Sequence, residues 1–245
     1  TISGGGSKTL RFLWDDIRLN ATNFLDVILT VALSQNDRTA RWKIEAVPNT
    51  PDFSLFGVVS PVISVRELAG DDFLLLPFYG GVMVHDPINA PAASLLYKMH
   101  EFGVDYGPGR FGVQLHAYWS RTDQELLYLS TNDSQGYVKR YPLETQTTAA
   151  GKNLVLQFEH IPINNNVPNT PWSQPYEVLI GPLAGDWYDA AQVYRSWATQ
   201  QNWVRRGKLE TTAQVSQGVK DAALAVVGFF DVPPANAAIT TLPAP

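Results

Sequence analysis

The chain has no cysteine and only four histidines among its 245 residues. Without cysteine there is no disulfide, no thiolate nucleophile and no cysteine-ligated zinc. The histidines are His85, His100, His116 and His160, and none lies within the roughly three to five residues of another that local zinc motifs use. The sequence therefore predicts neither a metal centre nor a bound cofactor.

Long apolar runs and clusters of basic residues are also missing. The longest apolar candidate, Ala222 to Phe230, is far shorter than the ~18 residues that a membrane-spanning helix needs. The 18 basic and 23 acidic residues give a net charge of −5, and no basic stripe is present that could neutralise a phosphate backbone. We expect no membrane span and no nucleic-acid partner.

The sequence does have a succession of short apolar runs that alternate or end in turn residues. Over residues 40–47, Trp42, Ile44 and Ala46 share one side of an extended chain, and charged residues occupy the other. Similar runs cover residues 9–14, 26–33, 55–59, 62–68, 73–76, 81–85, 113–120, 125–130, 136–141, 153–161 and 176–181. This spacing predicts a mainly β protein whose antiparallel strands build a sandwich.

Three further segments connect these runs. Residues 94–99 fit either a strand or one helical turn, whereas residues 103–112, with four glycines and a proline, predict a loop. Residues 131–136 are dense in turn formers, so we expect the runs at 125–130 and 136–141 to pair as a hairpin.

One segment, residues 186–204, has the apolar spacing of an amphipathic helix. Its apolar residues are three and four positions apart, namely Trp187, Ala190, Ala191, Tyr194, Trp197 and Ala198. Asp186 is a good N-cap, and the basic residues and glycine at 205–207 suit a helix end. We expect this helix near the C-terminus to pack its aromatic stripe against the sandwich.

Candidates for chemistry are few. Paired carboxylates could serve glycoside hydrolysis, and the candidates are Asp15 with Asp16, Asp71 with Asp72, and Asp133, although adjacent Asp residues are more often solvated turn formers. No Gly-x-Ser-x-Gly elbow accompanies His85 and Asp86, which argues against a hydrolase triad. The seven Trp and ten Tyr residues suit stacking on sugar rings, although most lie at positions typical of a core.

Two sequons favour a secreted or extracellular glycoprotein. Asn20-Ala-Thr22 and Asn132-Asp-Ser134 fit the N-glycosylation pattern, whose alternative interpretation is an ordinary polar turn.

Residues 181–198, GPLAGDWYDAAQVYRSWA, continuing through 200–203 and 207–209, resemble a segment of predicted glycoside hydrolases. Residues 126–133, 136–139 and 175–181 are similar to a sandwich hairpin and the last strand of the same family. In that family an N-terminal galactose-mutarotase-like β-supersandwich runs through such a helix into a catalytic (β/α)8 barrel, and endo-α-N-acetylgalactosaminidases share this layout.

The resemblance implies a β-supersandwich over residues 1–209, with its closing helix at 186–204, and an extension or linker over 210–245. Residues 222–230 would correspond to the first strand of a barrel that this sequence does not contain. The family's catalytic carboxylates lie on the barrel, so no catalytic residue carries over. If the hairpin brings them together, a sugar would contact Trp119, Tyr128, Asp133 and Lys139.

Three functions follow as hypotheses. The leading one is a non-catalytic β-sandwich module of a glycoside-hydrolase-like protein, acting in carbohydrate recognition or as a scaffold. The second is a structural subunit of an extracellular assembly, in which residues 222–245 associate with a protein partner or with a second copy. The third is a fragment of an active glycoside hydrolase whose barrel lies outside this chain.

Overall fold

The computed structural model describes residues 6–19, 22–67, 71–77, 81–90, 105–106, 113–205, 207–208 and 210–221. The sequon at Asn20, the segment 94–99 and the apolar extension 222–245 lie outside these residues. Within the predicted loop 103–112, Asp105–Tyr106 forms the short strand β7.

The described chain is mainly β, as the sequence predicts. The first seven strands are β1 (Lys8–Leu19), β2 (Thr22–Leu33), β3 (Ala40–Pro48), β4 (Val58–Arg66), β5 (Asp72–Leu76), β6 (Val82–His85) and β7 (Asp105–Tyr106). The next seven are β8 (Leu115–Ser120), β9 (Glu125–Thr131), β10 (Lys139–Arg140), β11 (Leu143–Thr148), β12 (Gly151–His160), β13 (Trp172–Ser173) and β14 (Val178–Ala184). The helical segments are α2 (Trp187–Ala198), the 3-10 turn η1 (Asn202–Val204) and α3 (Gln217–Lys220).

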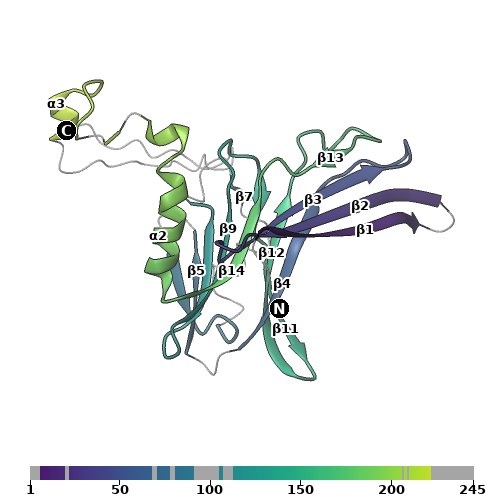
Figure 1. Ribbon diagram of the computed structural model, residues 1–245, viewed down its shortest axis with the longest axis horizontal. Helices are drawn as coiled ribbons and strands as arrows, with labels where there is room; N and C mark the ends of the chain where they lie inside the picture. The colour runs from purple at the N-terminus through teal and green to yellow at the C-terminus, as the bar shows by residue number, and fades with distance from the viewer. Residues whose placement is uncertain are drawn as a thin grey trace, which may run out of the picture. The chain divides into compact units, whose positions relative to one another are not determined.

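The described strands form two antiparallel sheets (Figure 1). The nine-stranded sheet has the order β1-β2-β3-β14-β9-β8-β5-β6, with β13 also pairing with β3. The five-stranded sheet has the order β11-β12-β10-β7, with β4 pairing with β12. The predicted antiparallel sandwich is therefore confirmed.

Contacts divide the chain into two units, Thr1–Asn202 and Trp203–Pro245. All fourteen described strands and α2 belong to the first unit, and α3 belongs to the second. The boundary that the sequence suggests at residue 209 stays a prediction. Among the described residues, no helix is long and apolar enough to cross a bilayer.

The main core lies between the two sheets. Leu74, Tyr118 and Leu129 from the nine-stranded sheet meet Leu154 and Phe158 from β12 in one buried cluster. Strand alternation sends the neighbours of these residues to the opposite face of the nine-stranded sheet. That face has a cluster of its own, and α2 covers it.

The second cluster joins α2 to strands β8 and β9. Leu115, Ala117 and Trp119 of β8 and Leu126 and Tyr128 of β9 pack with the helix residues Ala190 and Tyr194. Trp197 is partly buried on the same cluster, and Figure 1 shows α2 lying along this part of the sheet. The predicted packing of the aromatic stripe is confirmed, although Trp187 remains 40% exposed.

The helix begins where the sequence predicts and ends earlier. The Asp186 side chain caps the backbone N–H of Tyr188, and the Asp189 side chain accepts from the Asp186 N–H in a capping box. After Ala198 the backbone hydrogen bonds join residues three positions apart, as in a 3-10 helix. The Gln201 N–H, for example, donates to the Ala198 carbonyl at 3.2 Å. The predicted continuation to residue 204 is therefore wrong, because the last residues form a 3-10 turn.

The predicted hairpin between residues 125–130 and 136–141 is also wrong. Strand β9 pairs with β8 and β14, whereas β10 pairs with β12 and β7 in the other sheet. The connecting turn is held by the Asp133 carboxylate, which accepts backbone N–H bonds from Gln135, Gly136 and Tyr137. Turn-forming residues identified the turn correctly, but they do not determine which strand the chain joins next.

Strand β4 joins two runs that the sequence predicts as separate strands, 55–59 and 62–68. It runs continuously through Pro61 and pairs with β12 alone among the described strands. A strand with one neighbour can accommodate proline, because the missing N–H is not needed on the free side.

Gly181 lies where β14 passes closest to the start of β3. A Cβ atom added there would overlap the Arg38 carbonyl oxygen and lie 2.8 Å from the Thr39 Cα. Both are backbone atoms, so the neighbours cannot move aside by a simple change of rotamer. Only glycine fits at this crossing.

We expect Gly181→Ala to lower the free energy of unfolding by about 1–3 kcal/mol, the usual cost of overpacking a rigid site. Urea denaturation monitored by tryptophan fluorescence would measure it. Gly218→Ala is the control, because nothing lies within 4 Å of a Cβ atom at that position. An unchanged midpoint for Gly181→Ala would contradict the close packing of β14 on residues 38–39.

Candidate functional site

The candidate site is a pocket at one end of the central strands. The strand registers place Tyr118 of β8 opposite Leu127 of β9, and Leu127 opposite Pro182 of β14. Two residues along, Glu125 faces Ala184 across the same pair of strands. The pocket that these residues line has a volume of about 670 Å³, which is within the range of small-molecule sites.

The pocket exists because β3 stops pairing with β14 at this point. Strand β3 begins at Ala40, which pairs with Ile180, and the residues before it turn away past Gly181. Beyond Gly181, β14 pairs with β9 alone among the described strands. A proline at position 182 is tolerated there because one side of the strand has no partner that needs its N–H.

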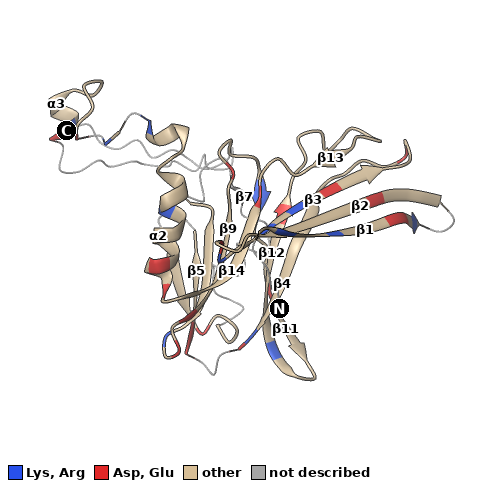
Figure 2. Cartoon of the chain, in the orientation of Figure 1, with Lys and Arg blue, Asp and Glu red and all other residues tan. Residues whose placement is uncertain are grey.

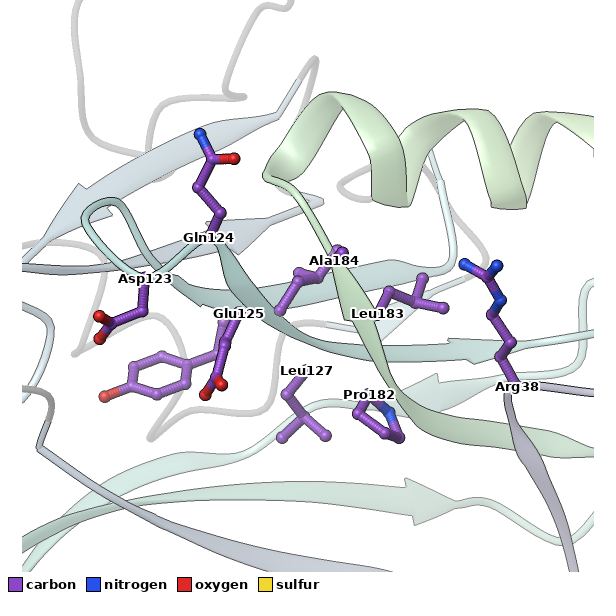
Figure 3. Close-up of a pocket in the computed structure, with 10 residues that line it drawn as sticks. Arg38, Asp123, Gln124, Glu125, Leu127, Pro182, Leu183 and Ala184 are labelled. Carbon is purple, nitrogen blue, oxygen red and sulfur yellow. The ribbon is translucent and has the colours of Figure 1, made fainter.

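Charged groups surround an apolar floor in this pocket. Figure 3 shows Asp123 and Glu125 towards one end, Arg38 at the opposite end, and Leu127 and Pro182 between them. The three charged residues are exposed, and within the described residues none of them belongs to an ion pair. Asp123 is held by the Ser120 hydroxyl, which donates to its carboxylate at 3.1 Å. The pocket thus offers hydrogen-bond donors and acceptors beside an apolar surface.

A second cavity, of about 530 Å³, lies beside α2. Its lining is almost entirely apolar and includes Leu75, Met83, Trp187 and Tyr194, with Arg195 as the charged residue. An apolar lining provides few groups that could orient a polar ligand. The pocket at Arg38 and Glu125 is therefore the better candidate for recognising a polar molecule.

The structure divides the four sequence-predicted sugar contacts into two separate pairs. Trp119 and Tyr128 lie beneath α2, where the Phe73 ring stacks on the Trp119 ring at 5.4 Å. Asp133 and Lys139 form an ion pair elsewhere in the core. All four side chains are at most 4% exposed, and their role in binding sugar stays a prediction.

The ion pair of Asp133 and Lys139 belongs to a buried polar network. Lys139 Nζ also donates to the Gln114 side chain at 3.3 Å and to the Tyr137 carbonyl at 2.8 Å, and it lies 4.4 Å from the centre of the Tyr176 ring. Burial lowers the pKa of Lys139 to about 8, and the bond and charge of Asp133 oppose this shift. The network links the turn after β9 to β10 in the other sheet.

His160 lies next to this network and is 1% exposed. One ring nitrogen lies 2.7 Å from the Ser60 carbonyl, and the other lies 2.6 Å from the Tyr176 hydroxyl. A carbonyl only accepts, so Nε2–H donates to Ser60 and Nδ1 accepts from Tyr176. Burial lowers the pKa of His160 to about 4, opposed by the bond to Ser60 and reinforced by the positive charge of Lys139.

The other acidic candidates have different surroundings. Asp72 is fully buried and bonds to the Tyr118 hydroxyl, so it is not a solvated turn residue, whereas Asp71 accepts from the Thr122 backbone N–H at 2.6 Å. Asp15 and Asp16 lie in a bulge of β1 beside Asp26, with one carboxylate oxygen of each within 4.8 Å of the others. These three carboxylates are the described group that could share a cation.

Sequence reasoning missed Arg38, Asp123 and Glu125. Each lies in or next to a turn, at positions where charged residues are common in any protein. No motif or spacing connects residue 38 to residues 123–125, because only the order of the strands brings them to one pocket.

Comparisons with known proteins match one segment of the chain to a family model and its fold to a solved structure. A domain of unknown function, DUF6259, matches residues 172–229, which overlap the segment that resembles predicted glycoside hydrolases. No curated protein matches the chain. Among solved structures, the fold is similar to the α-N-acetylgalactosaminidase NagBb from Bifidobacterium bifidum in complex with GalNAc, at a TM-score of 0.56 and 14% identity. That match covers 84% of this chain and 30% of the enzyme, so this chain spans less than a third of it.

We expect Lys139→Met to lower the free energy of unfolding by about 3–5 kcal/mol, because Asp133 would keep a buried charge without its partner. Arg41→Met is the exposed control, since Arg41 pairs with Asp37 at 3.0 Å and with Glu177 at 3.3 Å, and the three side chains are 44%, 31% and 32% exposed. Loss of an exposed pair should cost less than about 1 kcal/mol. Equal losses in chemical denaturation would contradict a buried, mutually dependent pair at 133 and 139.

We also expect stability to fall as the pH drops from about 6.5 to about 4. In the unfolded chain His160 takes up a proton near pH 6.5, whereas in the folded chain its pKa is about 4. The unfolded state therefore binds more protons over this interval, and protons favour unfolding. Unfolding free energies measured across the interval should show a smaller pH slope for His160→Asn. The exposed His85→Asn is the control, and an unchanged slope in His160→Asn would refute the assignment.

Proposed function

We propose that the chain is a non-catalytic module of a glycoside-hydrolase-like protein and that it binds carbohydrate in the pocket of Figure 3. One observation carries the proposal: exposed Arg38, Asp123 and Glu125 surround the apolar surface of Leu127 and Pro182. A sugar presents hydroxyl groups around its edge and C–H groups on its faces. Charged donors and acceptors suit the hydroxyls, and the apolar floor suits the faces.

Two further observations support the proposal. The fold is similar to part of an α-N-acetylgalactosaminidase solved in complex with the sugar GalNAc. The resemblance to supersandwich domains suggests that the galactose-mutarotase-like assignment is the right finer class.

We also propose a secreted or extracellular location, on the grounds of the sequons at Asn20 and Asn132.

A second function is favoured by the extent of the structural match. Because this chain corresponds to 30% of NagBb, we also propose that it belongs to an active glycoside hydrolase whose barrel lies on a longer polypeptide. The two proposals agree about the pocket and differ about the whole protein. Turnover of an aryl glycoside by the longer polypeptide, with none by residues 1–245, would support this second proposal.

We expect Glu125→Gln to weaken sugar binding about 10-fold, the loss that accompanies removal of one charge-assisted hydrogen bond. A glycan array would identify the ligand, and isothermal titration would measure its affinity for each variant. Glu144→Gln is the matched control, because Glu144 is an exposed residue on β11 that does not line the pocket.

Two results would count against the proposal. No binding across the array would refute carbohydrate recognition, and equal losses in both glutamate variants would place the sugar outside this pocket. Glycoside turnover by residues 1–245 alone would refute the non-catalytic assignment.

A further inference from the structure

Strand β1 forms one edge of the nine-stranded sheet. It is 12 residues long, and among the described strands it pairs with β2 alone. Its register with β2 is regular from Lys8 to Trp14 and is then interrupted by a bulge. The backbone N–H and C=O groups on its outer side thus form an uninterrupted row that another strand could extend.

The side chains of this edge are unusually apolar for an exposed strand. Leu10 is 61% exposed, Phe12 45%, Leu13 53% and Trp14 48%. Leu10, Phe12 and Trp14 share one face of the strand, and the Phe12 and Trp14 rings stack at 6.2 Å. Exposed apolar residues this close together indicate a surface that a partner covers.

The charged residues of β1 form a basic segment, then an acidic pair, and then a single arginine. Lys8 and Arg11 lie in its first half, whereas Asp15 and Asp16 lie in its second half, followed by Arg18. The two aspartates join Asp26 in the carboxylate group described above. Figure 2 shows basic residues on the first part of β1, acidic residues further along, and a basic residue near its end. An antiparallel copy of the same strand, related by a two-fold axis near Phe12, would place Lys8 beside this acidic pair.

We propose that β1 pairs antiparallel with β1 of a second copy of this chain, about a two-fold axis near Phe12. In this register Leu10 lies opposite Trp14 of the other copy, and the two Phe12 residues face each other. Lys8 then lies beside the acidic group at the end of the other β1. The pairing satisfies the free edges of both sheets and joins them into one continuous sheet, which is an isologous interface.

Self-pairing matches the chemistry of this edge better than pairing with an unrelated strand. A two-fold axis near Phe12 matches Leu10 with Trp14 and Phe12 with Phe12 on one face, and Lys8 with the acidic pair at both ends. On the other face the Leu13 side chain lies opposite Arg11. Both matches arise because the two paired strands have the same sequence and run in opposite directions. The inference concerns β1 and is independent of the sugar pocket, to which β1 contributes no lining residue.

The absence of cysteine allows a direct test of the register. In Phe12→Cys the two thiols would lie directly opposite each other, with Cβ atoms about 4.5–5.5 Å apart, close enough to form a disulfide with a small adjustment. In the matched variant Leu10→Cys they would be about 13 Å apart, since residue 10 faces residue 14. Mild oxidation should link Phe12→Cys into a covalent dimer and leave Leu10→Cys uncoupled. Equal coupling, or none, would overturn the proposed register.

Sedimentation velocity would test the association itself. The unmodified chain should approach twice its mass of 27.1 kDa as concentration rises. Phe12→Lys places like charges directly opposite each other and should raise the dissociation constant by more than about 10-fold, whereas Ile163→Lys, at a loop position 75% exposed, should leave it unchanged. Circular dichroism would establish that both variants fold. A chain that stays monomeric, or a dimer that Phe12→Lys does not weaken, would overturn the proposal.

Discussion

The fold depends on the burial of the central strands β8 and β9 on both faces. Leu127 and Leu129 point towards the five-stranded sheet, whereas Leu126 and Tyr128 point towards α2. Each layer therefore covers one set of alternate residues, and neither layer could be removed without exposing an apolar face. The helix is part of the core for this reason, and its capping box fixes where it begins immediately after β14.

Much of this architecture could be predicted from local pattern. Alternation of apolar and charged residues identified β3, and the three-and-four spacing of Ala190, Tyr194 and Trp197 identified the helix and its buried face. The pairing of the strands was harder to predict from the sequence. The segment after β9 has the composition of a hairpin turn, but β10 joins the other sheet, because Asp133 and Lys139 are buried partners between the two layers. Such long-range pairing leaves no periodic signal in the sequence.

The polar core explains why Asp133 and Lys139 looked like surface residues in the sequence. Charged side chains are rarely fully buried, so an acidic residue in a turn and a lysine three residues after a glycine predict solvent exposure. Here Asp133 accepts three backbone N–H bonds and Lys139 is surrounded by oxygen acceptors and the Tyr176 ring. Full satisfaction of both partners makes their burial tolerable, and it restricts the turn to one geometry.

Strand order accounts for the pocket in the same way that it accounts for the core. Central strands buried on both faces cannot present a hollow to solvent except where a neighbouring strand ends. That condition is met beyond Gly181, where β14 no longer pairs with β3. Pro182 and Leu127 therefore form the floor of an accessible site. The surrounding Arg38, Asp123 and Glu125 come from turns and strand ends, whose side chains can change without disturbing the two clusters beneath them. A scaffold of this kind keeps its fold while its recognition residues vary, which is consistent with a fold shared at 14% identity.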